Sequence, residues 1–232
     1  MNDVNASIIT IGDELLIGQT IDTNSAFIAQ ELNKIGVWLK RRVAVGDVKE
    51  EILQALKQET AESNIIIITG GLGPTADDLT KPTLCEYFGS HIVVDEAALQ
   101  NVKDIFTRMN RPLIERNLKQ AEVPDNCTVL QNKRGTAPGM WFEKDGVIYA
   151  SLPGVPHEMK GLITEEVIPR IVARFSLPVV IHRTLLTAGI GESMLAEAIL
   201  DFEEQLPSFI KLAYLPAYGM VRLRLTARGE KE

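Results

Sequence analysis

The chain has 232 residues, 45% of them hydrophobic, and its 24 Lys and Arg against 31 Asp and Glu give a formal charge of −7. This length can bury about 70% of the unfolded surface, and two distant cysteines supply neither a disulfide framework nor a zinc finger. No apolar stretch approaches the ~20 residues of a membrane span, and Met1-Asn2-Asp3 lacks the basic start of a secretory signal. We therefore expect a cytoplasmic protein with no membrane role, whose acidic balance argues against broad nucleic-acid binding.

The first part of the chain alternates β-branched runs with helical patterns, which is typical of βαβ units on a mostly parallel sheet. Strands are predicted over 7–11, 37–45 and 65–69, and the third is apolar on both faces, which places it centrally. One helix begins near residues 22–24. A second follows Asp47, where Glu50 three residues later fits a capping box.

The chain then continues with shorter elements up to a boundary near residues 176–178. We expect, in order, a helix near 82–89, an edge strand at 91–94, helices at 96–109 and 114–120, a strand at 128–130, a hairpin of 140–143 with 147–152, and a helix from 153–156 to about 175. These elements complete a first domain of residues 1–175.

Residues 179–232 have a different order of predicted elements. A strand at 179–187, a helix at 192–204 and strands at 209–214 and 220–227 predict a small β-α-β-β domain. Because no helix closes it, we expect the chain to be a fragment of a longer polypeptide. This segment holds six Lys and Arg against seven Asp and Glu, so nucleic-acid binding is predicted to be unlikely, although Gly189-Ile190-Gly191-Glu192 is faintly similar to the loops of RNA-binding KH domains.

Four loops could carry chemistry, because most of them follow strands whose carboxyl ends meet at one edge of a parallel sheet, where open α/β folds bind ligands. The first runs from Gly12 through Asp13 and Glu14 to Asp22. Its adjacent carboxylates could hold a hard divalent cation, and a polar loop with a helix cap is the alternative interpretation.

The second loop is Thr69-Gly70-Gly71-Leu72-Gly73-Pro74-Thr75-Ala76-Asp77-Asp78. Its glycines let the backbone approach a ligand and aim N–H groups at phosphate oxygens, and Thr75 adds a hydroxyl donor. The pair Asp77-Asp78 would repel a phosphate unless a cation such as Mg²⁺ lies between them. The loop is neither a Walker motif nor a dinucleotide fingerprint.

The other two loops contain Gly135 and the pair Pro153-Gly154, the latter directly before a helix N-terminus that favours anions. Each is more often an ordinary turn, and their joint occurrence is what favours a site. Asp47 follows the second strand and could serve as a helix cap, as a site residue, or as both. One residue of the 40–42 basic cluster could reach a phosphate, although a surface cluster is the plainer interpretation.

These motifs together resemble a known superfamily. The segments at 12–24, 69–80 and 152–156 are similar to the molybdopterin-binding domain superfamily, and Gly-Leu-Gly-Pro-Thr-x-Asp-Asp resembles the form found in the competence/damage-inducible CinA family. Residues 183–193 and 212–216 resemble that family's small KH-like middle domain. The resemblance implies a three-layer α/β/α domain with a mostly parallel sheet, a small C-terminal α+β KH-like domain and a homodimer.

The resemblance also implies an activity, namely cleavage of ADP-ribose to AMP and ribose 5-phosphate with a divalent metal such as Mg, Mn or Co. In pterin-handling relatives, an acidic residue after the second strand and one after the Gly-Gly loop are important, and these correspond to Asp47 and Asp78. We predict catalytic roles for Asp78, Asp47 and Glu14, and metal binding by Asp78, Asp47 and the second-tier Asp13, with Asp22 also second-tier. The predicted substrate contacts are Gly12, Thr69, Gly70, Gly71, Gly73, Thr75, Gly135, Pro153 and Gly154.

Three alternatives remain open at this point. The same loops would suit a pterin or nucleotidyl transferase of molybdenum cofactor metabolism, or a nucleotide-sensing module that binds without turnover. An RNA-binding adaptor that uses the small domain is the third. The nicotinamide mononucleotide deamidase domain that full-length members of the family often carry has no room in this chain.

Overall fold

The computed structural model describes residues 4–75 and 77–230, which divide into two compact units. The large unit comprises Met1–Asn33 and Val37–Phe175, and the small unit comprises Lys34–Gly36 and Ser176–Glu232.

The large unit is built on a six-stranded sheet with the strand order β2-β1-β3-β8-β7-β6. Four neighbouring strands are parallel: β2 (Trp38–Val45), β1 (Asn5–Ile11), β3 (Ile65–Thr69) and β8 (Val147–Leu152). The hairpin partner β7 (Gly139–Lys144) and the edge strand β6 (Thr128–Leu130) run antiparallel to their neighbours. β3 lies in the interior of the sheet, as its two-sided apolar sequence predicts.

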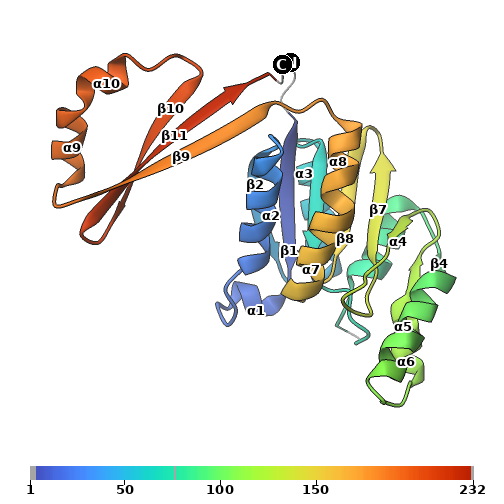
Figure 1. Ribbon diagram of the computed structural model, residues 1–232. Coiled ribbons are helices and arrows are strands. Elements are labelled where there is room, and N and C mark those ends of the chain that lie inside the picture. Colours follow the sequence, from blue (N-terminus) through green and yellow to red (C-terminus); the bar gives the residue numbers. More distant parts are fainter. Residues whose placement is uncertain (1–3, 76, 231–232) are drawn as a thin grey trace. The chain divides into compact units, whose positions relative to one another are not determined.

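Helices cover both faces of this sheet and give three layers (Figure 1). One layer holds α2 (Thr23–Lys34), α7 (Pro156–Leu162) and α8 (Ile168–Arg174), the last two joined by a π-helical turn at Ile163–Val167. The other layer holds α3 (Lys49–Thr60) and α4 (Thr80–Phe88). A short helix, α1 (Asp13–Leu16), follows β1 directly. The predicted α/β fold class with a mostly parallel sheet is confirmed.

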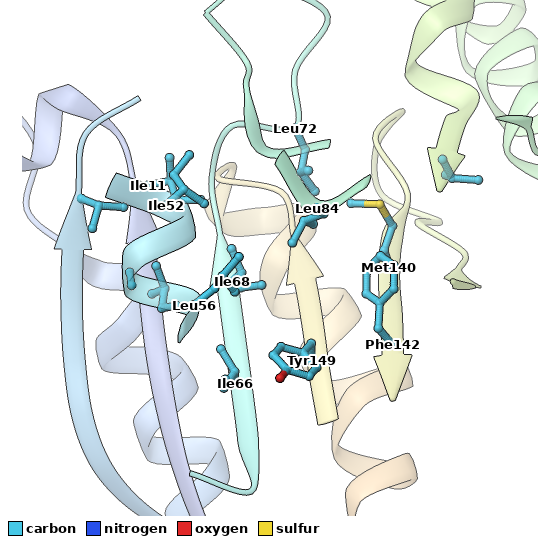
Figure 2. Close-up of a cluster of buried hydrophobic side chains, with 14 of the residues drawn as sticks. Ile11, Ile52, Leu56, Ile66, Ile68, Leu72, Leu84, Met140, Phe142 and Tyr149 are labelled. Carbon is cyan, nitrogen blue, oxygen red and sulfur yellow. The ribbon is translucent and has the colours of Figure 1, made fainter. Parts of the chain in front are cut away.

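The core forms because β3 is apolar at successive positions and its side chains alternate between the two faces. Ile66 and Ile68 pack with Ile52 and Leu56 of α3, as Figure 2 shows, while Ile65 and Ile67 have the opposite alternation and face the layer of α2, α7 and α8. All four isoleucines of the strand are fully buried.

A smaller antiparallel pair lies beside this sheet. β4 (Ile92–Val94) pairs with β5 (Glu122–Pro124), and the intervening chain forms α5 (Glu96–Arg108), α6 (Glu115–Leu118) and a 3-10 turn at Lys119–Ala121. The sequence predicts β4 but not β5, because three residues ending in proline show no alternation.

The small unit is a three-stranded antiparallel sheet with the order β10-β11-β9 and two helices. Its elements are β9 (Val179–Ala188), α9 (Glu192–Ala198), α10 (Leu200–Glu204), β10 (Ile210–Ala217) and β11 (Met220–Gly229). Leu195 of α9 packs on Val221 and Leu223 of β11. None of the described helices in either unit is long and apolar enough to cross a membrane.

Candidate functional site

The carboxyl ends of the parallel strands meet at one edge of the large unit's sheet, and the loops that follow them line a cavity of about 270 Å³. The lining residues are 10–12 at the end of β1, 14–15 in α1, 20–24 before and within α2, Asp47 after β2, 69–71 at the end of β3, 77–78 before α4, and Gly154 and Pro156 after β8. Segments more than a hundred residues apart in sequence thus form a single site.

The cavity brings together most of the predicted site residues. Those that line it are Glu14, Asp47, Asp78, Gly12, Thr69, Gly70, Gly71 and Gly154. The second-tier Asp22 lines it as well. Predicted residues that lie outside the described lining are Asp13, Gly73, Thr75, Gly135 and Pro153.

Two of the lining glycines hold strand ends together. The N–H of Gly12 donates to the Val45 carbonyl at 3.1 Å, and that of Gly70 donates to the Leu152 carbonyl at 3.1 Å. Gly70 has φ 113°, and a Cβ there would lie 2.1 Å from the Ile11 carbonyl oxygen, so only glycine fits. These N–H groups are therefore not available to a phosphate, although the sequence predicts that role for both residues.

Two other glycines keep their N–H groups free. Among the described residues, the backbone N–H groups of Gly71 and Gly154 have no acceptor. The Asn24 amide donates to the Gly154 carbonyl at 2.7 Å, and the Thr69 hydroxyl donates to the Pro153 carbonyl at 3.0 Å, so the loop after β8 is fixed. Pro153, a predicted substrate contact, serves here as an acceptor that orients Gly154. For Asn24 the sequence predicts only a place at the start of a helix, although the residue directly follows Asp22-Thr23 in the first motif.

Asp78 is engaged by its own loop. Its carboxylate accepts hydrogen bonds from the Gly73 N–H at 2.8 Å, the Thr75 N–H at 2.9 Å and the Thr75 hydroxyl at 2.5 Å. The donors that the sequence assigns to a phosphate are thus directed to Asp78, which shapes the loop while lining the cavity. Asp77, its neighbour, also lines the cavity and is exposed.

Asp13 and Asp47 are joined by two hydrogen bonds, each from the backbone N–H of one residue to the carboxylate of the other. The Asp13 N–H donates to Asp47 Oδ2 at 3.1 Å, and the Asp47 N–H donates to Asp13 Oδ1 at 3.2 Å. The predicted cap at Asp47 is wrong, because α3 is preceded by Val48 and has no side-chain cap. Partial burial raises the pKa of Asp47, and the charges of Asp13, Glu14 and Asp77 raise it further, against the lowering effect of the hydrogen bond from Asp13.

Asp22 does cap a helix while lining the cavity. Its Oδ1 accepts from the Ser25 N–H at 2.8 Å at the start of α2, and its Oδ2 lies 3.8 Å from Arg42 Nη2. Arg41 pairs with Glu59 at 3.3 Å, and Lys40 pairs with Glu62. Each member of the basic cluster therefore has a carboxylate partner, and none lines the cavity.

Gly135 lies against a different side chain. A Cβ at this position would fall 2.0 Å from Cδ of Glu158, so the glycine permits close packing of this carboxylate. Burial raises the pKa of Glu158, and a hydrogen bond from the Asn132 amide acts in the opposite direction. The Gly135 carbonyl also accepts from Asn101 at 3.0 Å. These contacts account for this glycine as a packing position.

The charged side chains that line the cavity are all acidic. Five carboxylates line it, those of Glu14, Asp22, Asp47, Asp77 and Asp78, and its described lining includes no lysine, arginine or histidine. Within residues 4–75 and 77–230, no cluster of three or more Asp, Glu, His or Cys side chains could hold a metal ion alone. Mg²⁺ is commonly held by one or two carboxylates together with substrate phosphates. The donor set therefore fits a cation that is completed by a phosphate ligand.

Comparison with family models covers both units. Residues 7–173 match the family described as "Probable molybdopterin binding domain", and residues 182–232 match the family described as "Damage-inducible protein CinA KH domain". A CinA-like protein from Flavobacterium psychrophilum is 52% identical over 230 residues, which is 99% of this chain and 55% of that protein. The chain thus spans about half the length of the curated relatives that it matches.

Solved structures resemble the large unit. A crystal structure of CinA, described as of unknown function, from Thermoplasma acidophilum is 36% identical with a TM-score of 0.65, covering 72% of this chain and 99% of that one. The molybdopterin biosynthesis enzyme MoaB from Thermus thermophilus has a TM-score of 0.51 at 16% identity, covering 74% of this chain and 93% of that one. At that identity the second likeness concerns the fold alone.

Proposed function

The chain belongs to the family of CinA-like proteins with a molybdopterin-binding-type domain, and from this premise we propose that its large unit is a metal-dependent pyrophosphatase. The proposed reaction cleaves ADP-ribose to AMP and ribose 5-phosphate. The observation that carries the proposal is the meeting of two free N–H groups, those of Gly71 and Gly154, with five carboxylates in one cavity. Backbone N–H groups suit phosphate oxygens, and the carboxylates make a cation necessary for an anionic substrate.

The reaction consumes one water. The water oxygen attacks one phosphorus, the bridging P–O bond breaks on the far side, and the products are AMP and ribose 5-phosphate. The proton of the attacking water passes to a carboxylate, and the leaving phosphate oxygen takes a proton from solvent. A divalent metal, when bound, would supply charge neutralisation for the diphosphate.

Asp47 is the best candidate for the general base. It lines the cavity, and its pKa is raised by burial and by three neighbouring carboxylates, so it accepts a proton more readily than an isolated aspartate. Glu14 and Asp77 line the cavity and are two of the three carboxylates whose charges raise the pKa of Asp47, and we assign them to the cation. Asp78 keeps a role in shaping the loop, since three donors already occupy its carboxylate.

The size of the cavity supports a substrate that extends beyond it. Its volume of about 270 Å³ is below the ~300–1,000 Å³ of sites that enclose drug-sized ligands. Ile21 lines the cavity while 83% exposed, and Leu15 lines it too. These apolar side chains suit the face of a base, while the diphosphate lies near Gly71 and Gly154.

A second candidate is a pterin or nucleotidyl transferase of molybdenum cofactor metabolism, which the match of residues 7–173 to a probable molybdopterin-binding family favours. A module that binds nucleotides without turnover is a third. A divalent metal as cofactor, homodimerisation and a cytoplasmic location remain parts of the proposal.

One experiment separates these functions. The 232-residue chain is incubated with ADP-ribose and Mg²⁺, Mn²⁺ or Co²⁺, and products are separated by chromatography while ADP-ribose binding is measured by calorimetry. Pyrophosphatase activity gives AMP and ribose 5-phosphate in equal amounts. If ADP-ribose binds but none of the three metals yields product, the result would contradict hydrolysis and favour the sensing module. Absence of both, with binding of a pterin phosphate, would favour the transferase.

A further inference from the structure

The two free N–H groups of the cavity belong to peptide units whose carbonyls are both hydrogen-bonded. The N–H of Gly154 shares a peptide plane with the Pro153 carbonyl, and the N–H of Gly71 shares one with the Gly70 carbonyl. A trans peptide points its C=O and its N–H in opposite directions, so a donor that holds the carbonyl also directs the N–H. The groups that bind these two carbonyls therefore set the direction of the free N–H groups.

Each of the two carbonyls accepts a hydrogen bond from a buried threonine. The Thr69 hydroxyl donates to the Pro153 carbonyl at 3.0 Å, and the Thr80 hydroxyl donates to the Gly70 carbonyl at 3.0 Å. Thr69 is the last residue of β3, Thr80 is the first residue of α4, and both side chains are buried. The loops after β3 and β8 are thus held in the same way by residues of two different elements.

The Thr69 hydroxyl can donate in only one direction. The Asn24 amide donates to Thr69 Oγ1 at 3.3 Å, so the single hydroxyl hydrogen is left for the Pro153 carbonyl. The same amide also donates to the Gly154 carbonyl at 2.7 Å. Oδ1 of Asn24 is buried and has no hydrogen-bond partner among the described residues, so this amide is placed by the two bonds that it donates.

Thr80 lies equally close to its own loop. Its backbone N–H donates to the Gly71 carbonyl at 3.3 Å, next to the bond from its hydroxyl to the Gly70 carbonyl. Gly71 has φ 62°, and a Cβ there would lie 2.2 Å from Thr80 Oγ1, so only glycine allows this approach. The N–H of Gly71 points away from the Thr80 hydroxyl, and Gly71 lines the cavity.

We propose that Thr69 and Thr80 are positioning residues for a diphosphate, because each buried hydroxyl fixes one peptide plane so that its N–H meets a phosphate oxygen. A hydrogen bond to the carbonyl also polarises the peptide, which makes the N–H a stronger donor. The sequence predicts that Thr69 contacts the substrate directly, and it assigns no role to Thr80. The inference rests on the proposed function for the presence of a diphosphate ligand, but not for its hydrolysis.

Binding of α,β-methylene-ADP with Mg²⁺ tests the proposal apart from catalysis, because its bridging carbon resists hydrolysis. Calorimetry is carried out on the whole chain. Valine has nearly the shape of threonine but lacks the hydroxyl, so Thr69→Val and Thr80→Val should each weaken binding about tenfold, as expected when one hydrogen bond to a charged group is misdirected. The double variant should lose about 100-fold if the two peptides act independently. Thr69→Ser and Thr80→Ser keep the hydroxyl and should restore most of the affinity.

Thr83→Val is the matched control. Thr83 is also buried in α4, and its hydroxyl donates to the Leu79 carbonyl at 2.7 Å, but neither residue lines the cavity. Thermal unfolding should show a loss of stability in this variant similar to that in Thr80→Val, while its affinity for α,β-methylene-ADP should equal that of the wild type. The same unfolding measurement establishes that each variant is folded.

Equal losses of affinity in Thr80→Val and Thr83→Val would overturn the proposal, because the hydroxyl would then act through stability alone. Serine variants that bind no better than the valine variants, or a wild type that does not bind α,β-methylene-ADP, would overturn it too. If the valine variants weaken binding as expected but the wild type does not cleave ADP-ribose, the pyrophosphatase proposal fails and the roles of the two threonines stand.

Discussion

Asp13 and Asp47 each donate a backbone N–H to the other's carboxylate, at 3.1 and 3.2 Å, across 34 residues of sequence. This reciprocal pair joins the start of α1 to the end of β2 and holds the Asp47 carboxylate at the wall of the cavity. The same closeness places two negative charges together, and the charge of Asp13 is one of those that raise the pKa of Asp47. Asp13 is therefore a positioning residue for Asp47.

Replacement of Asp13 by Asn tests this coupling. The Asn side chain keeps an oxygen that can accept from the Asp47 N–H but loses the negative charge, so the pKa of Asp47 should fall. The basic form of Asp47 then persists to lower pH, and the acid limb of the kcat/KM profile for ADP-ribose hydrolysis should shift downward. Asp201→Asn in the small unit is the matched control and should leave the profile in place. An upward shift or none for Asp13→Asn would contradict the coupling.

The loop that contains Asp78 predicts a coupled effect of two substitutions. Asp78→Asn replaces an acceptor oxygen by a donor, and Thr75→Val removes a hydroxyl that bonds the same carboxylate. Both should reduce hydrolysis by disturbing one loop, so the double variant should lose less than the sum of the single losses in free energy. Initial rates of the four forms measure this coupling. Full activity of Asp78→Asn would remove Asp78 from the account, and strict additivity would assign it a role apart from the loop.

Lys81 predicts a pH dependence of stability. The residue is 9% exposed, its Nζ donates to the Gln120 carbonyl at 2.9 Å, and burial lowers its pKa from 10.5 to about 8. Between these values the unfolded chain binds more protons than the folded one, so folding stability rises with pH. This gain in the free energy of unfolding amounts to about 3 kcal/mol in total. It is lost as the pH falls to about 8.

The measurement compares urea unfolding of the wild type and Lys81→Met from pH 7 to pH 10.5. Groups common to both proteins cancel in the difference, and the wild type should gain on the variant above pH 8. A difference that stays constant across this range would show that the pKa of Lys81 is not lowered.

The two cysteines should be unreactive in the folded protein. Cys85 is buried, and burial raises the pKa of Cys127 to about 12, so almost no thiolate is present at pH 8. A thiol reagent such as 5,5′-dithiobis(2-nitrobenzoate) should react slowly with the native chain and rapidly with two thiols in guanidinium. Rapid native reaction of one thiol would contradict the burial of Cys127.

Gly70 should not tolerate a side chain. In Gly70→Ala the Cβ would lie 2.1 Å from the Ile11 carbonyl oxygen, and the positive φ of 113° adds strain. We expect a loss of more than about 1 kcal/mol in the free energy of unfolding, measured by urea denaturation. Gly191→Ala is the control, because nothing lies within 4 Å of its Cβ position. Equal stability of the two variants would show that β1 and β3 separate without cost.

The sequence predicts that the loops after the parallel strands meet at one edge of the sheet. Four isoleucines before Thr69 identify an interior strand, and parallel order then brings the loops after Ile11, Val45 and Thr69 to one edge. Residue types thus indicate which loops meet. They do not indicate which hydrogen bonds each group makes, since Gly12 and Gly70 were expected to donate to phosphate and donate to neighbouring strands instead.

Sequence patterns do not predict hydrogen bonds between side chains and backbone groups that lie far apart in the chain. The cap predicted at Asp47 follows a correct local rule, but the carboxylate is taken by Asp13 from another loop, and α3 begins after Val48 without a side-chain cap. Likewise, the Thr69 hydroxyl donates to the Pro153 carbonyl, 84 residues further along the chain. Only the pairing of β3 with β8 brings these two groups together.

The most direct test of the central claim is the initial rate of AMP release from ADP-ribose by the wild type and by Asp47→Asn, each with Mn²⁺ or with a chelator. The account predicts equal yields of AMP and ribose 5-phosphate from the wild type with metal, none with chelator, and a rate at least about 100-fold lower for Asp47→Asn. Thermal unfolding of the variant serves as its folding control. No AMP from the wild type with Mg²⁺, Mn²⁺ or Co²⁺, or an equal rate from Asp47→Asn, would contradict the account.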